Sequence, residues 1–147
     1  DLDELEKAYL KLQQLFHPDK YSQLSDQEIK YSTLLSSMIN EAYQKLNSSI
    51  SRATILLKLN GFNPHSEDKS FNDPDVLEEI MDIQNEFLEA ESSEIKKLSI
   101  QKLNSKISET MDNLSISFKN RQYETANKLN IKLSYLEKIR IDFKKQL

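Results

Sequence analysis

The chain of 147 residues contains no cysteine, one glycine and three prolines, and each shortage excludes a class of structure or chemistry. Without cysteine there can be no disulfide, no thiol nucleophile and no thiolate metal site. With so little glycine and proline, the sequence lacks the turn residues that β-hairpins need. Apolar runs are only a few residues long, so no segment is expected to span a membrane. These absences favour a soluble, helical protein in a reducing compartment.

Charge and histidine content narrow the possible chemistry further. The net charge of −4 argues against nucleic acid as the main partner, and no glycine-rich loop is present to hold a nucleotide phosphate. The two histidines, His17 and His65, are not placed with other ligands at the spacing of a zinc site. His17 and Asp19 could form a base and its orienting group, but no activated nucleophile accompanies them. We therefore expect no enzymatic activity, no metal and no cofactor.

A His-Pro-Asp-Lys tetrapeptide at residues 17–20 lies between two segments in which apolar residues recur at helical spacing. The first helix, from about residue 3 to 16, should end at the histidine because the following proline disfavours helical conformation there. The second helix should begin after Ser25, which has capping-box spacing with Glu28, and should end near residue 46. The pattern thus predicts a loop held between two helices.

Two lysines, the end of a third helix and a long loop are further features of the first half of the chain. Lys7 and Lys11 lie opposite the apolar stripe of the first helix, and spacing alone favours a solvated face for them. A third helix should end at Asn60-Gly61, because the glycine can adopt a left-handed C-cap conformation. Residues 61–73 form the only long loop-like stretch. We place a domain boundary there.

The fourth helix should begin at Asp73-Pro74, an N-cap followed by the first helical position, and it carries two neighbouring apolar stripes. The first stripe consists of Val76, Ile80, Ile83, Phe87 and Ala90, and the second of Leu77, Met81 and Leu88. Together they cover about half of the helix circumference, whereas one buried face needs roughly 100°. Two interpretations stay open: the helix packs between two neighbours, or the second stripe contacts a partner.

The last two helices should each carry one narrow apolar seam, which is typical of antiparallel neighbours in a bundle. The fifth helix has its expected seam at Ile100, Leu103, Ile107, Met111, Leu114 and Phe118. The sixth helix has its expected seam at Ala126, Leu129, Leu133, Leu136 and Phe143. A short turn near residues 120–123 should join them. Ile131 and Tyr135 lie off the sixth seam and are candidates for an exposed apolar patch.

The N-terminal segments resemble a J-domain. The similarity covers the helix at residues 5–16, the loop His17-Pro18-Asp19-Lys20 and the helix that ends Ile39-Asn40-Glu41-Ala42-Tyr43-Gln44-Lys45-Leu46. These segments are similar to helices II and III of that fold, whereas helix I is absent. Because the chain opens at Asp1 inside a helical pattern, a preceding segment is expected. The resemblance implies that the loop stimulates ATP hydrolysis by a DnaK-type chaperone.

Three later segments resemble the HscB family of iron–sulfur co-chaperones, so the similarity covers nearly the whole chain in order. These segments are Arg52–Leu57 with Leu59–Phe62, Asp73–Ile83 and Lys132–Arg140. The resemblance implies an all-α protein with a C-terminal antiparallel three-helix bundle that binds the scaffold IscU and delivers it to the chaperone HscA. It implies a J-domain without helix I and a connecting helix at 1–60, an elbow loop at 61–73, and the scaffold-binding bundle at 74–147.

The resemblance also assigns residues to two binding sites. Chaperone contacts are expected at His17, Pro18, Asp19, Lys7, Lys11 and Lys20, and scaffold contacts at Val76, Leu77, Met81, Asp82, Asn85 and Tyr135. Glu78 stands where relatives often have methionine, and Asn85 where they often have an acid. Leu77 and Met81 belong to the stripe that periodicity left unassigned.

Two other functions stay open at this point. The first is a general J-domain protein with a helical client-binding or dimerisation domain, and the second is a structural helical adaptor with a vestigial loop. The HscB resemblance places the chain in the bacterial cytoplasm or, alternatively, in the mitochondrial matrix.

Overall fold

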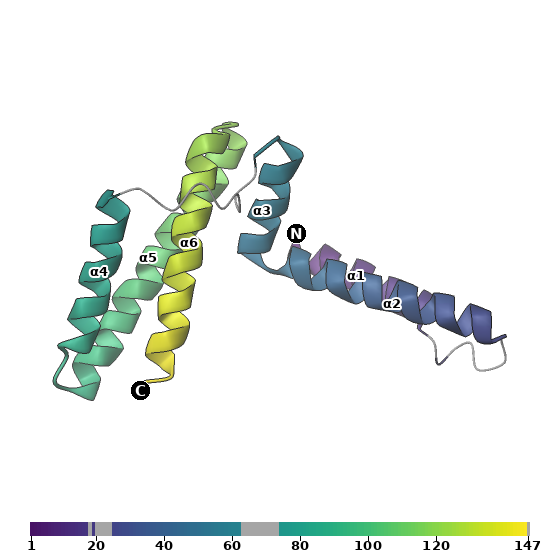
Figure 1. Ribbon diagram of the computed structural model, residues 1–147, viewed down its shortest axis with the longest axis horizontal. Coiled ribbons are helices and arrows are strands. Elements are labelled where there is room, and N and C mark those ends of the chain that lie inside the picture. Colours follow the sequence, from purple (N-terminus) through teal and green to yellow (C-terminus); the bar gives the residue numbers. More distant parts are fainter. Residues whose placement is uncertain (18, 20–24, 63–73, 147) are drawn as a thin grey trace. The chain divides into compact units, whose positions relative to one another are not determined.

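The computed structural model describes residues 1–17, 19, 25–62 and 74–146. These residues form six α-helices and no strand, which confirms the all-α prediction (Figure 1). The helices are α1 (Leu2–Phe16), α2 (Asp26–Asn47), α3 (Ser49–Leu59), α4 (Pro74–Leu88), α5 (Ser93–Lys119) and α6 (Tyr123–Lys144).

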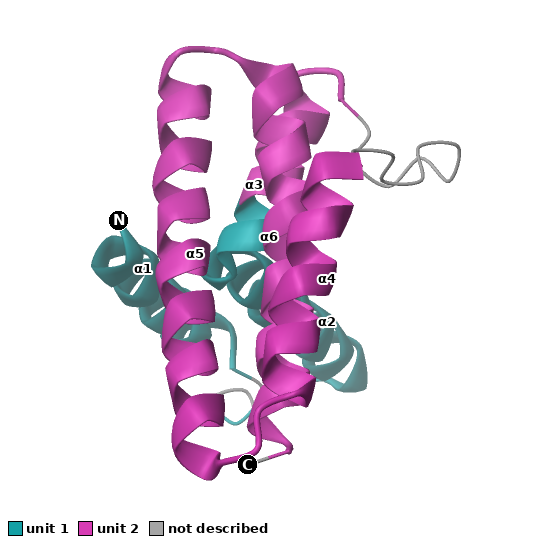
Figure 2. Ribbon diagram, turned by 90° about the vertical axis from the view of Figure 1, so that its left-hand side faces the viewer, with its two compact units in different colours: residues 1–52 teal, residues 53–147 magenta. Residues whose placement is uncertain are grey.

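The chain divides into two compact units, Asp1–Arg52 and Ala53–Leu147 (Figure 2). The division falls inside α3, whose buried residues Ala53, Thr54 and Leu57 all belong to the second unit. Most of the loop-like stretch in which we placed the domain boundary, residues 63–73, lies outside the described residues. The three-part domain organisation therefore stays a prediction.

Local capping signals determine where the helices of the first unit end, as the sequence predicted. His17 follows α1 with an extended backbone (φ −67°, ψ 130°), and its N–H donates to the carbonyl of Gln13 at 2.9 Å. At the start of α2, the Glu28 carboxylate accepts hydrogen bonds from the backbone N–H of Ser25 at 3.0 Å and from its hydroxyl at 2.7 Å. These bonds lower the pKa of Glu28, and they confirm the predicted capping box.

Polar side chains connect the antiparallel helices α1 and α2. Asn40 Oδ1 accepts hydrogen bonds from the Tyr9 hydroxyl at 2.8 Å and from Gln13 Nε2 at 2.6 Å. The Ser36 hydroxyl donates to Gln13 Oε1 at 3.0 Å, and the buried residues in the described part of this unit are Ser32 and Ser36. Hydrogen bonds thus contribute to the seam between α1 and α2, and hydrophobic periodicity does not detect them.

An open apolar groove of about 410 Å³ runs along one side of the α1–α2 hairpin. It is lined by Leu5, Ala8, Tyr9, Leu12, Leu35, Met38, Ile39, Ala42, Tyr43 and Leu46. Residues of the two predicted amphipathic stripes therefore face each other across the groove. Leu12, Leu35 and Met38 remain exposed, so the hairpin alone does not cover its apolar surface.

The core of the second unit lies between α5 and α6 and is closed by α4 and α3. Its buried apolar residues are Ala53, Leu57, Ile80, Phe87, Ile100, Leu103, Ile107, Leu114, Ala126, Leu133, Leu136, Ile139 and Phe143. The predicted seams are correct at most positions, but Met111 is exposed and Phe118 and Leu129 are only partly buried.

Small hydroxyl residues replace the expected apolar residues along the α5 seam. Thr110 and Ser117 are buried there, one position before Met111 and Phe118 respectively. The Thr110 hydroxyl donates to the carbonyl of Lys106 at 2.8 Å, and the Ser117 hydroxyl to that of Asn113 at 2.9 Å. Because each hydroxyl is satisfied within its own helix, it enters the core without an unpaired polar group.

The structure shows which of the two α4 stripes is buried. Ile80 and Phe87 of the first stripe are buried, and the Phe87 ring stacks on that of Phe143 in α6 with centroids 3.7 Å apart. All members of the second stripe, Leu77, Met81 and Leu88, are exposed. One stripe therefore lies in the core, and the other is presented on the surface.

The ends of the connecting helices also follow local signals. α3 ends at Leu59, and Gly61 adopts a left-handed φ of 83° while the N–H of Phe62 donates to the carbonyl of Leu57 at 2.9 Å. α4 begins at Pro74 as predicted, although its expected cap Asp73 lies outside the described residues.

Candidate functional site

The first candidate site is the loop that follows α1. The His17 side chain is 48% exposed, and its Nδ1 lies 3.5 Å from Oδ2 of the highly exposed Asp19. The backbone N–H of Asp19 donates to the same Nδ1 at 3.3 Å. In the tautomer whose Nδ1 accepts this bond, the ring proton is on Nε2, which is then the donor of the ring. Pro18 and Lys20 lie outside the described residues.

The two lysines of α1 are near this loop in sequence and are solvent-exposed. Lys7 and Lys11 both lie on the outer side of the hairpin, away from the Gln13 and Asn40 hydrogen bonds. Their exposure leaves them available to an acidic surface.

The second candidate site is the exposed stripe of α4 with its neighbours. Leu77 is 38% exposed and Met81 is 60% exposed, although each is a large apolar side chain. Asp82 and Asn85 are also exposed, whereas Val76 is half-buried. The structure thus places five of the six expected scaffold contacts on α4, with four of them open to solvent.

Tyr135, the sixth expected contact, belongs to α6 and is 40% exposed. It lies one helical turn after Lys132, whose ammonium contacts the Glu79 carboxylate of α4. Because Glu79 stands between Leu77 and Met81 in sequence, α4 and α6 are adjacent at the level of the exposed stripe. Ile131, the other expected member of an exposed patch, is only partly exposed.

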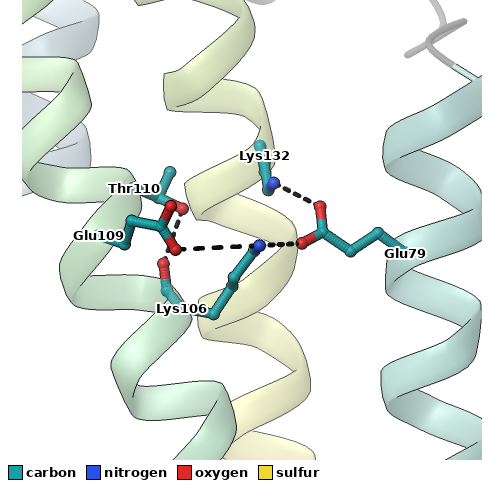
Figure 3. Close-up of polar contacts among 5 residues, drawn as sticks. All are labelled: Glu79, Lys106, Glu109, Thr110 and Lys132. Atoms are coloured by element: carbon teal, nitrogen blue, oxygen red, sulfur yellow. Dashed lines mark hydrogen bonds and ion pairs between the residues drawn. The ribbon is translucent and has the colours of Figure 1, made fainter.

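A three-helix ion cluster forms around Glu79 of α4 (Figure 3). The Glu79 carboxylate contacts Lys106 of α5 at 2.5 Å through one oxygen and Lys132 of α6 through the other. Partial burial raises the pKa of Glu79, but hydrogen bonds and charge from both lysines outweigh burial, so its pKa lies below 4.5. The bond to Glu79 in turn raises the pKa of Lys106.

Two properties of the described residues bear on other kinds of function. These residues contain no cluster of histidine, aspartate and glutamate side chains that could hold a metal ion. None of the helices in the described part of the chain is long and apolar enough to cross a membrane.

Several known proteins are similar to this chain. The family described as the HscB C-terminal oligomerisation domain matches residues 72–144. The human iron–sulfur cluster co-chaperone protein HscB is 35% identical over 139 residues, which are 95% of this chain and 59% of that protein. A co-chaperone protein HscB homolog of Neisseria meningitidis is 31% identical over 144 residues, covering 95% of this chain and 86% of the homolog. The crystal structure of human co-chaperone protein HscB has a TM-score of 0.88 and 32% identity, covering 99% of this chain and 74% of that one.

The fold and these similarities define a class of all-helical proteins in which a J-type hairpin precedes a helical bundle. The chain belongs to the HscB family. It spans 59% of the length of the human and mouse relatives that it matches.

Sequence reasoning missed two polar features of these sites. The Gln13–Asn40 bond supports the helix that carries Lys7 and Lys11, and the Glu79 cluster supports the helix that carries Leu77 and Met81. The available signal for Glu79 was the presence of one acidic helix beside two helices with an excess of lysine and arginine. Charge pattern alone does not show which side chains meet.

Proposed function

We propose that this chain is a co-chaperone of iron–sulfur cluster assembly that binds the scaffold IscU, delivers it to the DnaK-type chaperone HscA and stimulates its ATPase. The chain itself is proposed to have no enzymatic activity. Its place of action is proposed to be the bacterial cytoplasm or, alternatively, the mitochondrial matrix.

The observation that carries this proposal is the exposed stripe of Leu77 and Met81 on a helix whose other stripe is buried. Exposed apolar side chains that gather on one face, with polar groups around them, are typical of protein–protein contacts. Tyr135 supplies an aromatic ring from the adjacent helix, while Val76, Asp82 and Asn85 border the stripe. Together these residues are the proposed scaffold-binding site.

The chaperone site is proposed at the other unit, around the exposed His17 loop. His17, Pro18 and Asp19 form its centre, and Lys7, Lys11 and Lys20 supply positive charge. His17 is suited to this role because its ring is open to solvent and its Nδ1 already accepts a hydrogen bond within the loop. The remaining ring nitrogen can bind an acceptor on the chaperone.

The proposed mechanism has three steps and involves no catalytic group of this chain. The scaffold docks on the Leu77, Met81 and Tyr135 surface of the bundle. The His17 loop then contacts the chaperone, and the lysines of α1 favour association by attracting acidic groups. ATP hydrolysis within the chaperone retains the scaffold and favours cluster release.

Purified IscU and HscA test both halves of this proposal in one experiment. The chain should retain each protein separately in a pull-down assay, and it should raise the ATPase rate of HscA further when IscU is present. Stimulation of the ATPase without retention of IscU would favour a general J-domain protein. Retention of neither protein would favour a structural adaptor.

A second candidate role, self-association through the bundle, is favoured by the matched family's description as an oligomerisation domain. Light scattering over a range of concentrations tests it directly. A mass that stays at the 17.2 kDa of one chain would exclude it.

A further inference from the structure

Charge is distributed unevenly among the helices of the bundle. α4 contains five acidic residues, Asp75, Glu78, Glu79, Asp82 and Glu86, and no lysine or arginine. Two of its acids form ion pairs across helices: Glu79 contacts Lys106 and Lys132, and Glu86 contacts Lys102. In both cases the acid belongs to α4 and the cation to α5 or α6.

Each half of α4 buries one large apolar side chain, Ile80 in the N-terminal half and Phe87 in the C-terminal half. Phe87 is fully buried against Phe143, and the Lys96 ammonium lies 5.4 Å from the Phe87 ring centroid. The N-terminal half buries only Ile80 among its large apolar residues. Glu79 is next to Ile80, so its two ion pairs add polar contacts with α5 and α6 to the apolar contact of that half.

The geometry of Glu79 is suited to joining α4 to two other helices. Its two carboxylate oxygens bind separate helices, and its side chain is only 28% exposed. Lys132 is 15% exposed, so the pair is less screened by solvent than an ordinary surface salt bridge. Figure 3 shows Glu79 extending from α4 toward both lysines.

Leu77 and Met81 lie two residues on either side of Glu79. Residues two apart in an α-helix are separated by about 200° around its axis, so both point away from the side that Glu79 occupies. Their exposure agrees with this position. A change in the contacts of Glu79 with α5 and α6 would therefore shift α4. It would move Leu77 and Met81 without altering their side chains.

We propose that Glu79 is a positioning residue for partner binding: by joining α4 to Lys106 and Lys132, it holds the Leu77 and Met81 surface in its binding arrangement. This proposal rests on the proposed function, because it takes that surface to be the scaffold contact. Glu79 acts through α4, and the scaffold's affinity should depend on the ion cluster as well as on the exposed side chains.

Glu79→Gln keeps the shape of the side chain but removes its charge, and it should loosen the N-terminal half of α4. Amide hydrogen exchange in residues 76–84 should become about tenfold faster, while exchange in α5 and α6 stays unchanged. The dissociation constant for purified IscU should rise about three- to tenfold, as expected for loss of a partly buried charge pair.

Two further variants separate positioning from simple loss of charge. Glu109→Gln removes another acid near Lys106, at 3.9 Å on the same helix, and it should change neither exchange in α4 nor scaffold affinity. The triple variant Glu79→Lys, Lys106→Glu and Lys132→Glu reverses the signs of these three charges. It should restore slow exchange and most of the affinity lost in Glu79→Gln.

The pH dependence supplies an independent readout. Lys106 and Glu109 face Glu79 from α5, and Lys132 faces it from α6. The pKa of Glu79 is lower in the folded chain than its ordinary value of 4.5. Its stabilising effect is therefore fully present above pH 4.5 and is lost as the pH falls through the folded pKa. The protection of α4 amides, corrected for the pH dependence of intrinsic exchange, should therefore fall over this acidic range in the wild type, whereas Glu79→Gln should lack the corresponding step.

The outcomes of these experiments are distinct. Unchanged exchange in Glu79→Gln would overturn the proposal, and so would faster exchange with unchanged scaffold affinity or failure of the sign-reversed variant to restore the affinity. If the wild-type chain itself does not bind IscU, the proposed function fails, and with it the positioning role. The exchange data would then still show whether the ion cluster holds α4.

Discussion

The Asn130 amide of α6 donates a hydrogen bond to the Thr54 hydroxyl of α3 at 3.0 Å, across 76 positions of sequence. Both residues are buried, and Asn130 is only 2% exposed. The Oδ1 atom of Asn130 has no hydrogen-bond partner among the described residues. Within the described part of the chain, this bond is a buried polar contact between α3 and α6.

Removing one partner of this pair should lower the free energy of unfolding more than removing both. Thr54→Val keeps the shape but leaves the Asn130 amide unpaired, which should lower the free energy of unfolding by about 1–3 kcal/mol. The double variant Thr54→Val and Asn130→Leu should recover much of that loss, because no buried polar group then remains. Chemical denaturation measures both. A double variant less stable than Thr54→Val would contradict this explanation.

His17→Gln should abolish stimulation of the chaperone ATPase while leaving helical content unchanged. The ring is half-exposed and lies outside the core, so no packing is lost. Steady-state ATPase assays and circular dichroism measure the two effects. Gln14→Ala, an exposed change three residues earlier, should leave stimulation intact. ATPase stimulation that persists in the His17→Gln variant would contradict the proposed role of the loop.

Truncating Leu77, Met81 and Tyr135 together to alanine should weaken scaffold binding without unfolding the bundle. Truncating a central apolar side chain of an interface typically weakens binding by about 1–4 kcal/mol. These three side chains are substantially exposed in this structure. Titration calorimetry on the folded variant gives the affinity. Ile141→Ala, which removes a side chain of α6 that is also exposed, is the matched control. An unchanged dissociation constant would favour a general J-domain protein instead.

Charge reversal at Lys7 and Lys11 should slow association with the chaperone, by about three- to tenfold at low ionic strength. Exposed charges act mainly on the association rate, and salt screens them. Stopped-flow measurements at several salt concentrations test this expectation. Reversal of Lys97 and Lys128, which are exposed on the bundle, controls for net charge. Equal rates in both variants would identify the α1 lysines as a solvated face.

The apolar groove of the α1–α2 hairpin should make residues 1–47 exchange amide hydrogens faster than residues 74–147. Covering this groove is favourable by about 25 cal/mol per Å² of apolar surface, and the J-domain resemblance implies that helix I covers part of it. A chain extended at its N-terminus should therefore show slower exchange in α1 and α2. Equal protection in both chains would show that the exposed groove does not limit their stability.

Sequence by itself determined the features of this protein that depend on a few neighbouring residues. Pro18 ends α1 at Phe16, Ser25 and Glu28 cap α2, and Gly61 permits the left-handed turn after α3. Each signal acts within one or two turns of backbone, so it can be recognised without knowledge of the fold. The same holds for the apolar periodicity that located the helices, and the resemblance to HscB added the expected site residues.

Only the tertiary structure decided which side chains meet. Periodicity could not tell which stripe of α4 is buried, because that depends on where α5 and α6 lie. It placed Met111 in the core, whereas Thr110 takes that position since its hydroxyl is satisfied by a carbonyl of its own helix. The contacts of Glu79 with Lys106 and Lys132 join residues 27 and 53 positions apart. Such pairings arise from helix packing, which no local signal encodes.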